Sequence, residues 1–300
     1  AGLAEGHWGG ALFRHGGGAD GYLIDKDGWD KFKTAVAECK RNGLDVWIYD
    51  EQFYPSGRAG GQTTDGHPEM EAQGLFYASM DVHVSDKDGK LVEWKLPDGK
   101  PFYVAVFPIS LIGTIYGDGE DMTGNVRDGV LKAELRKGGW RLVAFVENRL
   151  YDGTHAPVTT GQPYLNVLDP AAVKRFIELT HERYYANCGD EFGKTIKAFF
   201  TDEPSVQGGF LTAEAQPYPA LSWYHGLPEI FKARNGYDIR KALPALFNDA
   251  GADTVRYRCD WYSTLSQQIA DAYFKQIRGW CEAHKVASTG HLLWEESLLY

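Results

Sequence analysis

Residues 196–205, Ile-Lys-Ala-Phe-Phe-Thr-Asp-Glu-Pro-Ser, form an apolar run that ends abruptly in two acids and a proline. Such a run is typical of a strand buried on both faces, and Pro204 cannot continue it because proline lacks the N–H that a sheet needs. Asp202 and Glu203 are therefore expected at the carboxyl end of a buried strand, where α/β barrels hold their chemistry. The alternative is that Asp202 caps the following turn while Glu203 is solvated.

The same pattern occurs twice more. Residues 44–49 run into Asp50 and Glu51, and residues 286–294 run into Glu295 and Glu296. Three apolar segments that end in paired acids indicate that several strands end at one polar pocket.

Strand and helix patterns alternate outside the middle of the chain. Strands are expected at residues 9–14, 46–50, 196–202 and 286–294, and helices at 26–42, 170–184 and 262–284, with shorter helices at 228–234 and 238–247. This alternation predicts parallel strands joined by right-handed crossovers.

Residues 75–155 instead contain short alternating segments separated by Asp-Gly or Gly-Gly pairs, which are hairpin signals. We expect an antiparallel β subdomain inserted into an α/β unit, so that residues 1–74 and 156–300 belong to one barrel. Outside the insertion about 219 residues supply four strands, whereas a complete eight-stranded barrel usually needs about 250 residues. The prediction is an incomplete (β/α)8 TIM barrel, truncated before its last strands, in an internal fragment of a longer protein.

Composition limits the partners. The net charge of −10 and the pI near 5.4 argue against nucleic acid or an anionic membrane surface as the main partner. No apolar run reaches the roughly 18 residues of a membrane span. Aromatic residues make up 14% of the chain and would suit a carbohydrate substrate, although most of them are expected in the core.

Several other residues could contact a substrate. Arg14 and His15 precede a Gly-rich loop, which lacks a phosphate-binding pattern. Tyr54 could hydrogen-bond a sugar hydroxyl or brace its loop, as could Arg58. His291 could bind a hydroxyl or be a packed histidine. Beyond these, Asp50 and Glu51 could bind sugar hydroxyls or a calcium ion, or could cap a helix or form a salt bridge.

Three segments, residues 46–61, 199–205 and 289–297, resemble large bacterial glycoside hydrolases of the α-L-rhamnosidase type, family 106 and its relatives. Residues 231–238, with 242–244, are similar to the segment after the acid/base strand in that group and in family 42 β-galactosidases. The resemblance covers nearly the whole chain outside the β insertion, and it favours a secreted or periplasmic location.

The resemblance implies that Glu203 occupies the acid/base position. The related barrels usually have Asn before this glutamate, and the Asp202 found here leaves open whether that residue orients the substrate or contacts a cation. Their nucleophile ends the seventh strand, which this chain would not reach. Family 106 enzymes are described as inverting with a calcium ion at the site, so Glu296 or Glu295 could instead serve as base.

The expected function is cleavage of a terminal, α-L-rhamnoside-like sugar from a plant or microbial oligosaccharide or polysaccharide, with Glu203 as proton donor and Glu296 or an absent residue opposite. The remaining barrel strands of the parent chain would complete the site. A retaining β-galactosidase-like enzyme, a metal-dependent sugar isomerase or lyase, and a non-catalytic carbohydrate-binding barrel remain alternatives.

Overall fold

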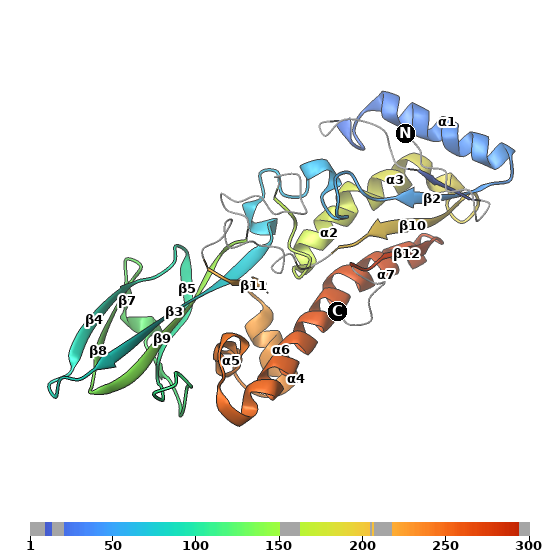
Figure 1. The fold of residues 1–300 in the computed structure, drawn as a ribbon. Helices are drawn as coiled ribbons and strands as arrows, with labels where there is room; N and C mark the ends of the chain where they lie inside the picture. The colour runs from blue at the N-terminus through green and yellow to red at the C-terminus, as the bar shows by residue number, and fades with distance from the viewer. Residues whose placement is uncertain (1–9, 14–20, 151–162, 205, 207–217, 294–300) are drawn as a thin grey trace. The chain divides into compact units, whose positions relative to one another are not determined.

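The computed structural model describes residues 10–13, 21–150, 163–204, 206 and 218–293 (Figure 1). The chain divides into two compact units, which are treated separately below. Unit 1 comprises Ala1–Ala72, His155–Gln207 and Ile269–Tyr300, and unit 2 comprises Gln73–Thr154 and Gly208–Gln268. Among the described residues, no helix has the length and apolar composition needed to cross a membrane.

Unit 1 is built on a four-stranded sheet in which every neighbouring pair is parallel, in the order β1-β2-β10-β12. The strands are β1 (Gly10–Phe13), β2 (Asp45–Tyr49), β10 (Ile196–Asp202) and β12 (Ala287–His291). The four strands expected from the sequence and their parallel pairing are therefore confirmed. The fold is a mixed α/β fold, and no closed barrel is seen in the described residues, so the TIM barrel stays a prediction.

The helices of unit 1 are α1 (Lys26–Arg41), α2 (Pro170–Leu179), α3 (His181–Cys188) and α7 (Lys275–Ala283). Asp25 caps α1, because its carboxylate accepts hydrogen bonds from the backbone N–H groups of Asp27 and Gly28. The helix expected over residues 170–184 is interrupted, because the Thr180 backbone leaves the helical path at φ −119°. The Thr180 hydroxyl donates to the carbonyl of Phe176 at 2.7 Å, a local bond that competes with helix continuation.

The helix expected near residues 262–284 begins earlier and is not uniform. It consists of three consecutive segments: α6 (Thr254–Ile269), a π-helical segment (Ala270–Phe274) and α7. The early start lies in residues whose apolar spacing is weak, so the sequence pattern showed only the later part.

Unit 2 contains two antiparallel sheets, in the orders β11-β3-β9-β5-β6 and β4-β8-β7. The strands are β3 (Gln73–Val84), β4 (Lys90–Lys95), β5 (Lys100–Pro108), β6 (Glu120–Asp121), β7 (Val126–Arg127), β8 (Val130–Leu135), β9 (Gly138–Arg149) and β11 (Ala220–Trp223). The expected antiparallel structure is confirmed, but the hairpins expected at the Asp-Gly pairs of residues 88–89 and 98–99 are wrong, because these pairs connect strands of different sheets. The Gly-Gly pair begins β9 instead of forming a turn. A core of buried Val, Leu and Ala side chains, including Val104, Leu131 and Leu142, lies in this part.

The Pro- and aromatic-rich composition of residues 217–225 predicts a loop, and this is wrong for β11, which pairs antiparallel with the edge of β3. The backbone edge of β3 supplies the hydrogen bonds that stabilise β11. The Pro- and aromatic-rich sequence around β11 does not indicate this pairing. Unit 2 also contains α4 (Leu227–Asn235), a 3-10 turn (Ile239–Lys241) and α5 (Leu243–Phe247), close to the short helices predicted there.

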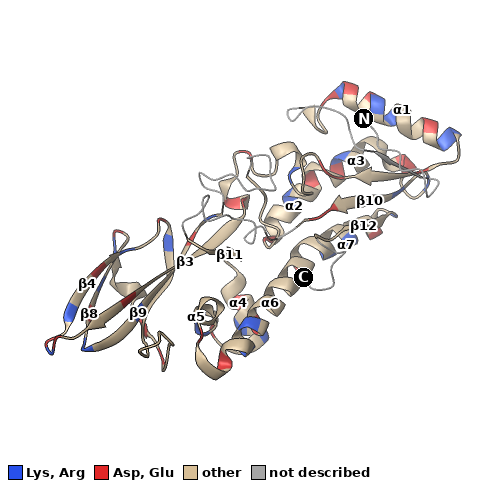
Figure 2. Cartoon of the chain, in the orientation of Figure 1, with Lys and Arg blue, Asp and Glu red and all other residues tan. Residues whose placement is uncertain are grey.

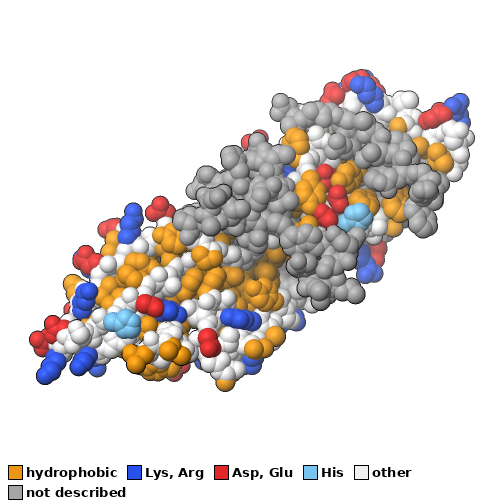
Figure 3. Space-filling view, in the orientation of Figure 1, with side chains coloured by type: hydrophobic (Ala, Val, Ile, Leu, Met, Phe, Trp, Pro, Cys, Tyr) orange, Lys and Arg blue, Asp and Glu red, His pale blue; other side chains and the backbone are white. Residues whose placement is uncertain are grey.

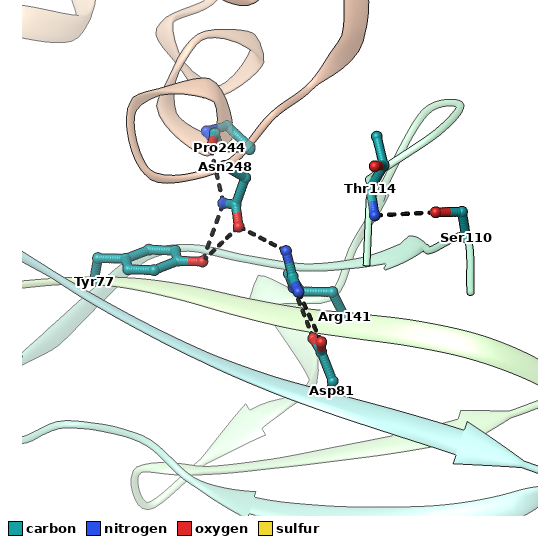
Figure 4. A network of polar contacts seen from close by, with 7 residues as sticks. All are labelled: Tyr77, Asp81, Ser110, Thr114, Arg141, Pro244 and Asn248. Atoms are coloured by element: carbon teal, nitrogen blue, oxygen red, sulfur yellow. Dashed lines mark hydrogen bonds and ion pairs between the residues drawn. The ribbon is translucent and has the colours of Figure 1, made fainter. Parts of the chain in front are cut away.

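A polar network joins the end of α5 to the five-stranded sheet (Figure 4). Arg141 donates two 2.7 Å bonds to the Asp81 carboxylate and a 2.9 Å bond to Asn248. The Asn248 amide then donates to Tyr77 and to the carbonyl of Pro244. Residues 208–268 therefore group with the antiparallel strands, and the division at residues 74/75 and 155/156 stays a prediction.

Candidate active site

The ends of three parallel strands meet at one edge of the unit 1 sheet. Asp202 lies opposite His291 in register, and the backbone N–H of Glu203 donates to the carbonyl of His291 at 3.2 Å. On the other side of β10, the N–H of Asp50 donates to the carbonyl of Phe200 at 3.1 Å. The parallel register therefore places the acids after β2 and β10 and the histidine of β12 at the same edge. Figure 2 shows acidic residues where β2 and β10 end. Acidic and histidine side chains are grouped on the face of unit 1 seen in Figure 3.

Glu203 follows β10 with a backbone φ of 47°, a left-handed conformation that is uncommon for a residue with a side chain. Such backbone outliers concentrate at functional sites, because the surrounding structure must hold them in place. The side chain is half-buried, and the Tyr54 hydroxyl donates a short hydrogen bond to its Oε2. The described residues provide no hydrogen bond to Oε1.

Asp202 is held between two aromatic side chains. Tyr49 donates to its Oδ2 at 2.8 Å, and Nδ1 of the half-exposed His291 lies 3.4 Å from its Oδ1. Burial, followed by the Glu51 charge and the bond to Asp202, raises the pKa of Tyr49 far above its usual value. Tyr49 therefore stays protonated and remains a hydrogen-bond donor.

Asp50 and Glu51 follow β2 and are both buried, with exposed fractions of 0% and 6%. Ser56 donates to Oδ1 of Asp50 at 2.6 Å. Burial raises the pKa of Asp50 to about 8, while the bonds from Ser56 and Thr201 oppose the shift. Asp50 thus lies beneath the site edge and not on its surface.

Arg58 is 2% exposed and lies under the loop that follows β2. Its guanidinium donates to the carbonyl of Pro163 at 3.3 Å and lies 5.5 Å from the ring of Tyr164. These contacts favour the loop-bracing role over a substrate contact for this residue.

The sequence did not identify Ser56 or Tyr49 as part of the site. Ser56 lies in a Pro-Ser-Gly turn directly after two acids, a small polar residue in a tight turn, and this was the available signal. Tyr49 is the last strand residue before the acids, and only the register shows which face of the sheet it occupies.

Four of the predicted site residues, Arg14, His15, Glu295 and Glu296, lie outside the described residues. Within the described ranges, no group of three or more His, Cys, Asp or Glu side chains is arranged to hold a metal ion. The calcium ion implied by the sequence resemblance therefore has no such ligand group among these residues.

The backbone is similar to that of a rhamnosidase. That protein, from Novosphingobium sp. PP1Y, superposes with a TM-score of 0.54 over 91% of this chain at 13% sequence identity. The match spans 41% of the rhamnosidase chain, and at this identity it establishes similarity of fold alone. No protein-family model and no curated protein sequence matches the chain.

Tyr54→Phe is expected to lower kcat several-fold to about tenfold in a turnover assay, because a typical intramolecular hydrogen bond contributes about 0.5–1.5 kcal/mol. The hydroxyl fixes Oε2 of Glu203, so its loss should affect kcat more than KM. The comparison variant is Tyr49→Phe, which removes the equivalent hydroxyl from Asp202. Steady-state kinetics in the natural protein test this, and wild-type kcat in Tyr54→Phe would show that the tyrosine does not orient Glu203.

Proposed function

We propose that this chain carries the acid/base part of a glycoside hydrolase site, with Glu203 as the proton donor to the leaving oxygen. The observation that carries the proposal is the place of its carboxyl group: Glu203 follows β10 at the edge where three strand ends meet, and Tyr54 donates a hydrogen bond to one of its two oxygens. The fold similarity to a rhamnosidase supports the same class of enzyme.

Glycoside cleavage needs one carboxyl group that donates a proton and a second carboxylate that attacks the sugar or activates water. Glu203 has the first role, and Glu296 or a residue beyond this chain has the second. Carboxyl groups about 5–5.5 Å apart retain the anomeric configuration, and groups about 6.5–9.5 Å apart invert it. Their separation in the natural protein would therefore predict the stereochemical outcome.

Asp202, Glu51, Tyr54 and His291 are proposed to bind sugar hydroxyls. His291 is half-exposed beside Asp202, so a ring nitrogen and a carboxylate oxygen occur together. This pairing offers a donor and an acceptor to neighbouring hydroxyls, which is the pattern that a sugar presents.

The substrate is proposed to be an α-L-rhamnoside-like terminal sugar on an oligosaccharide or polysaccharide. A screen of the natural protein on aryl glycosides tests this, with α-L-rhamnoside first and β-D-galactoside second. Release of the aryl group from the rhamnoside is expected, with activity on the galactoside at least tenfold lower. Faster cleavage of the galactoside would overturn the substrate assignment while leaving the hydrolase class intact.

Two further measurements separate the rival classes. Conversion of a free sugar without glycoside cleavage, abolished by EDTA, would favour a metal-dependent isomerase. Sugar binding detected by calorimetry with no product released from any glycoside would favour a non-catalytic binding protein. Either result would contradict the proposed hydrolase.

A further inference from the structure

A directed chain of hydrogen bonds runs from the backbone before Glu203 into the interior of unit 1. The N–H of Asp202 donates to Oγ of Ser56 at 2.7 Å, and the backbone N–H of Ser56 donates back to the carbonyl of Asp202 at 2.9 Å. Since the Ser56 hydroxyl has one hydrogen, that hydrogen goes to Oδ1 of Asp50 at 2.6 Å. Ser56 therefore holds the Asp202 peptide on both sides and connects it to Asp50.

The far end of this chain fixes the tautomer of His181. The Thr180 hydroxyl donates its hydrogen to the carbonyl of Phe176, so Oγ1 accepts the 2.8 Å bond from Nδ1 of His181. Nδ1 thus carries the proton, and Nε2 presents a lone pair. Nε2 lies 3.8 Å from Oδ2 of Asp50.

Asp50 Oδ2 and His181 Nε2 are both buried, and neither makes a hydrogen bond of normal geometry in the part of the chain that the structure describes, where the Thr201 hydroxyl also lies near the Asp50 carboxyl group. Both residues are 0% exposed, so bulk water does not reach them. Two acceptors that face each other in the interior would be costly, because neither electron pair would be compensated. A proton on Oδ2 of Asp50 removes this conflict, because the two atoms then no longer face each other as two acceptors, although at 3.8 Å they lie beyond hydrogen-bond distance.

We propose that Asp50 is a neutral carboxylic acid that acts, through Ser56, as a positioning residue for the strained backbone at Glu203. It does not touch the sugar. Hydrogen bonds connect its carboxyl group through Ser56 to the Asp202 backbone, which directly precedes the left-handed residue Glu203.

The surroundings of Asp50 favour the neutral form. Burial raises its pKa to about 8 and lowers that of His181 to about 3, so both are uncharged at neutral pH. The ionisable groups facing Asp50 are Glu51 after β2, Asp202 after β10, His181 on α3, and Tyr273 and Cys281 on the C-terminal helices. The two carboxylates repel a charge on Asp50, and burial of the other three leaves them neutral.

A neutral Asp50 also limits the charge at the site. An ionised Asp50 would add a third buried or half-buried negative charge beside Glu51 and Asp202, and like charges at this range disfavour one another. The neutral carboxyl group of Asp50 therefore contributes hydrogen bonding without adding a negative charge. Asn has the same shape, and its amide can accept from Ser56 and donate to His181.

The catalytic part of this inference rests on the proposed function, but the position of the proton does not. The first test is infrared difference spectroscopy of this chain at pH 6, wild type against Asp50→Asn. A carbonyl band of a protonated carboxyl group is expected in the wild type and absent in Asp50→Asn. The control is Asp65→Asn, which changes an exposed acid of the same unit and should keep the band. Absence of the band from the wild type would overturn the proposal.

The second test is the pH dependence of unfolding. The raised pKa of Asp50 contributes stability that is full below its ordinary value of 3.8 and is lost as the pH rises through about 8. The lowered pKa of His181 has the opposite slope below 6.5, so the two cancel there and Asp50 alone acts above it. Between pH 6.5 and 8 the unfolding constant of the wild type should rise about tenfold per pH unit relative to Asp50→Asn. Parallel pH curves would overturn the proposal.

The third test is kinetic and uses the natural protein. Asp50→Ala and Ser56→Ala should each lower kcat at least 100-fold with KM changed less, because a small displacement of the acid has an effect of this size. Asp50→Asn should restore kcat to within about tenfold of the wild type. Equal losses in Asp50→Asn and Asp50→Ala would show that Asp50 acts as a charged group, which contradicts the proposal. If no glycoside is cleaved at all, the proposed function fails, and the two tests above still decide where the proton lies.

Discussion

Glu203→Gln is expected to reduce kcat on an unactivated glycoside about 10²- to 10⁴-fold, because amides cannot donate a proton to the leaving oxygen. The loss should be much smaller for an aryl glycoside with a good leaving group, since such a group departs without protonation. Gln preserves the size of the side chain and can still accept the hydrogen bond from Tyr54, so the fold should be kept. Steady-state rates on the two substrates, measured in the natural protein, check this.

The matched control is Glu229→Gln, which changes an exposed acid on α4 and should leave both rates unaltered. Near-normal turnover of the unactivated glycoside by Glu203→Gln would rule out Glu203 as the proton donor. A uniform loss on both substrates would indicate a role in binding and would also contradict the assignment.

Gly290→Ala is expected to lower the free energy of unfolding by about 3 kcal/mol or more, because overpacking and backbone strain act together. Gly290 has φ 151°, and a Cβ at this position would lie 1.9 Å from the backbone carbonyl oxygen of Thr201. Thr201 immediately precedes Asp202 on the neighbouring strand, so β12 would have to move away from β10. Urea unfolding measures the loss, and hydrogen exchange of the β10 amides shows where it occurs.

Gly43→Ala is the control for backbone conformation alone. Gly43 has φ 66°, and an added Cβ would meet no atom within 4 Å. Its expected cost is about 1–2 kcal/mol, the penalty for a left-handed residue that has a side chain. Equal losses in the two variants would mean that the close approach of β12 to β10 does not matter.

The strand ends of unit 1 could be predicted because two independent sequence signals coincide there. Apolar runs mark the buried strands, and the acids that follow mark where burial ends, so residues 44–51 and 196–205 were placed at the correct edge. The Asp-Gly pairs at residues 88–89 and 98–99 correctly marked where strands of unit 2 end, but they connect strands of different sheets and not the two strands of a hairpin.

Other features depend on partners far away in the chain. β11 forms because β3 offers a free edge, and that edge is 140 or more residues earlier in the sequence. The break at Thr180 is a competition between one side-chain bond and helix continuation, which apolar spacing does not report.

The site itself was predicted by residue type but not by role. Asp50 looked like a surface acid that binds substrate, because the sequence shows a carboxylate at a strand end and not its burial. Ser56 and His181 explain its surroundings, and they come from a turn and from a helix about 130 residues downstream. Neither contact leaves a local trace in the sequence.

The most direct test of the central claim is a structure of the natural protein with Glu203→Gln and an intact rhamnoside bound. The account predicts that the side chain at position 203 lies within about 2.6–3.2 Å of the glycosidic oxygen, with Tyr54 bonded to its other atom. A sugar bound elsewhere, or a side chain at position 203 that points away from the bond to be cleaved, would contradict it.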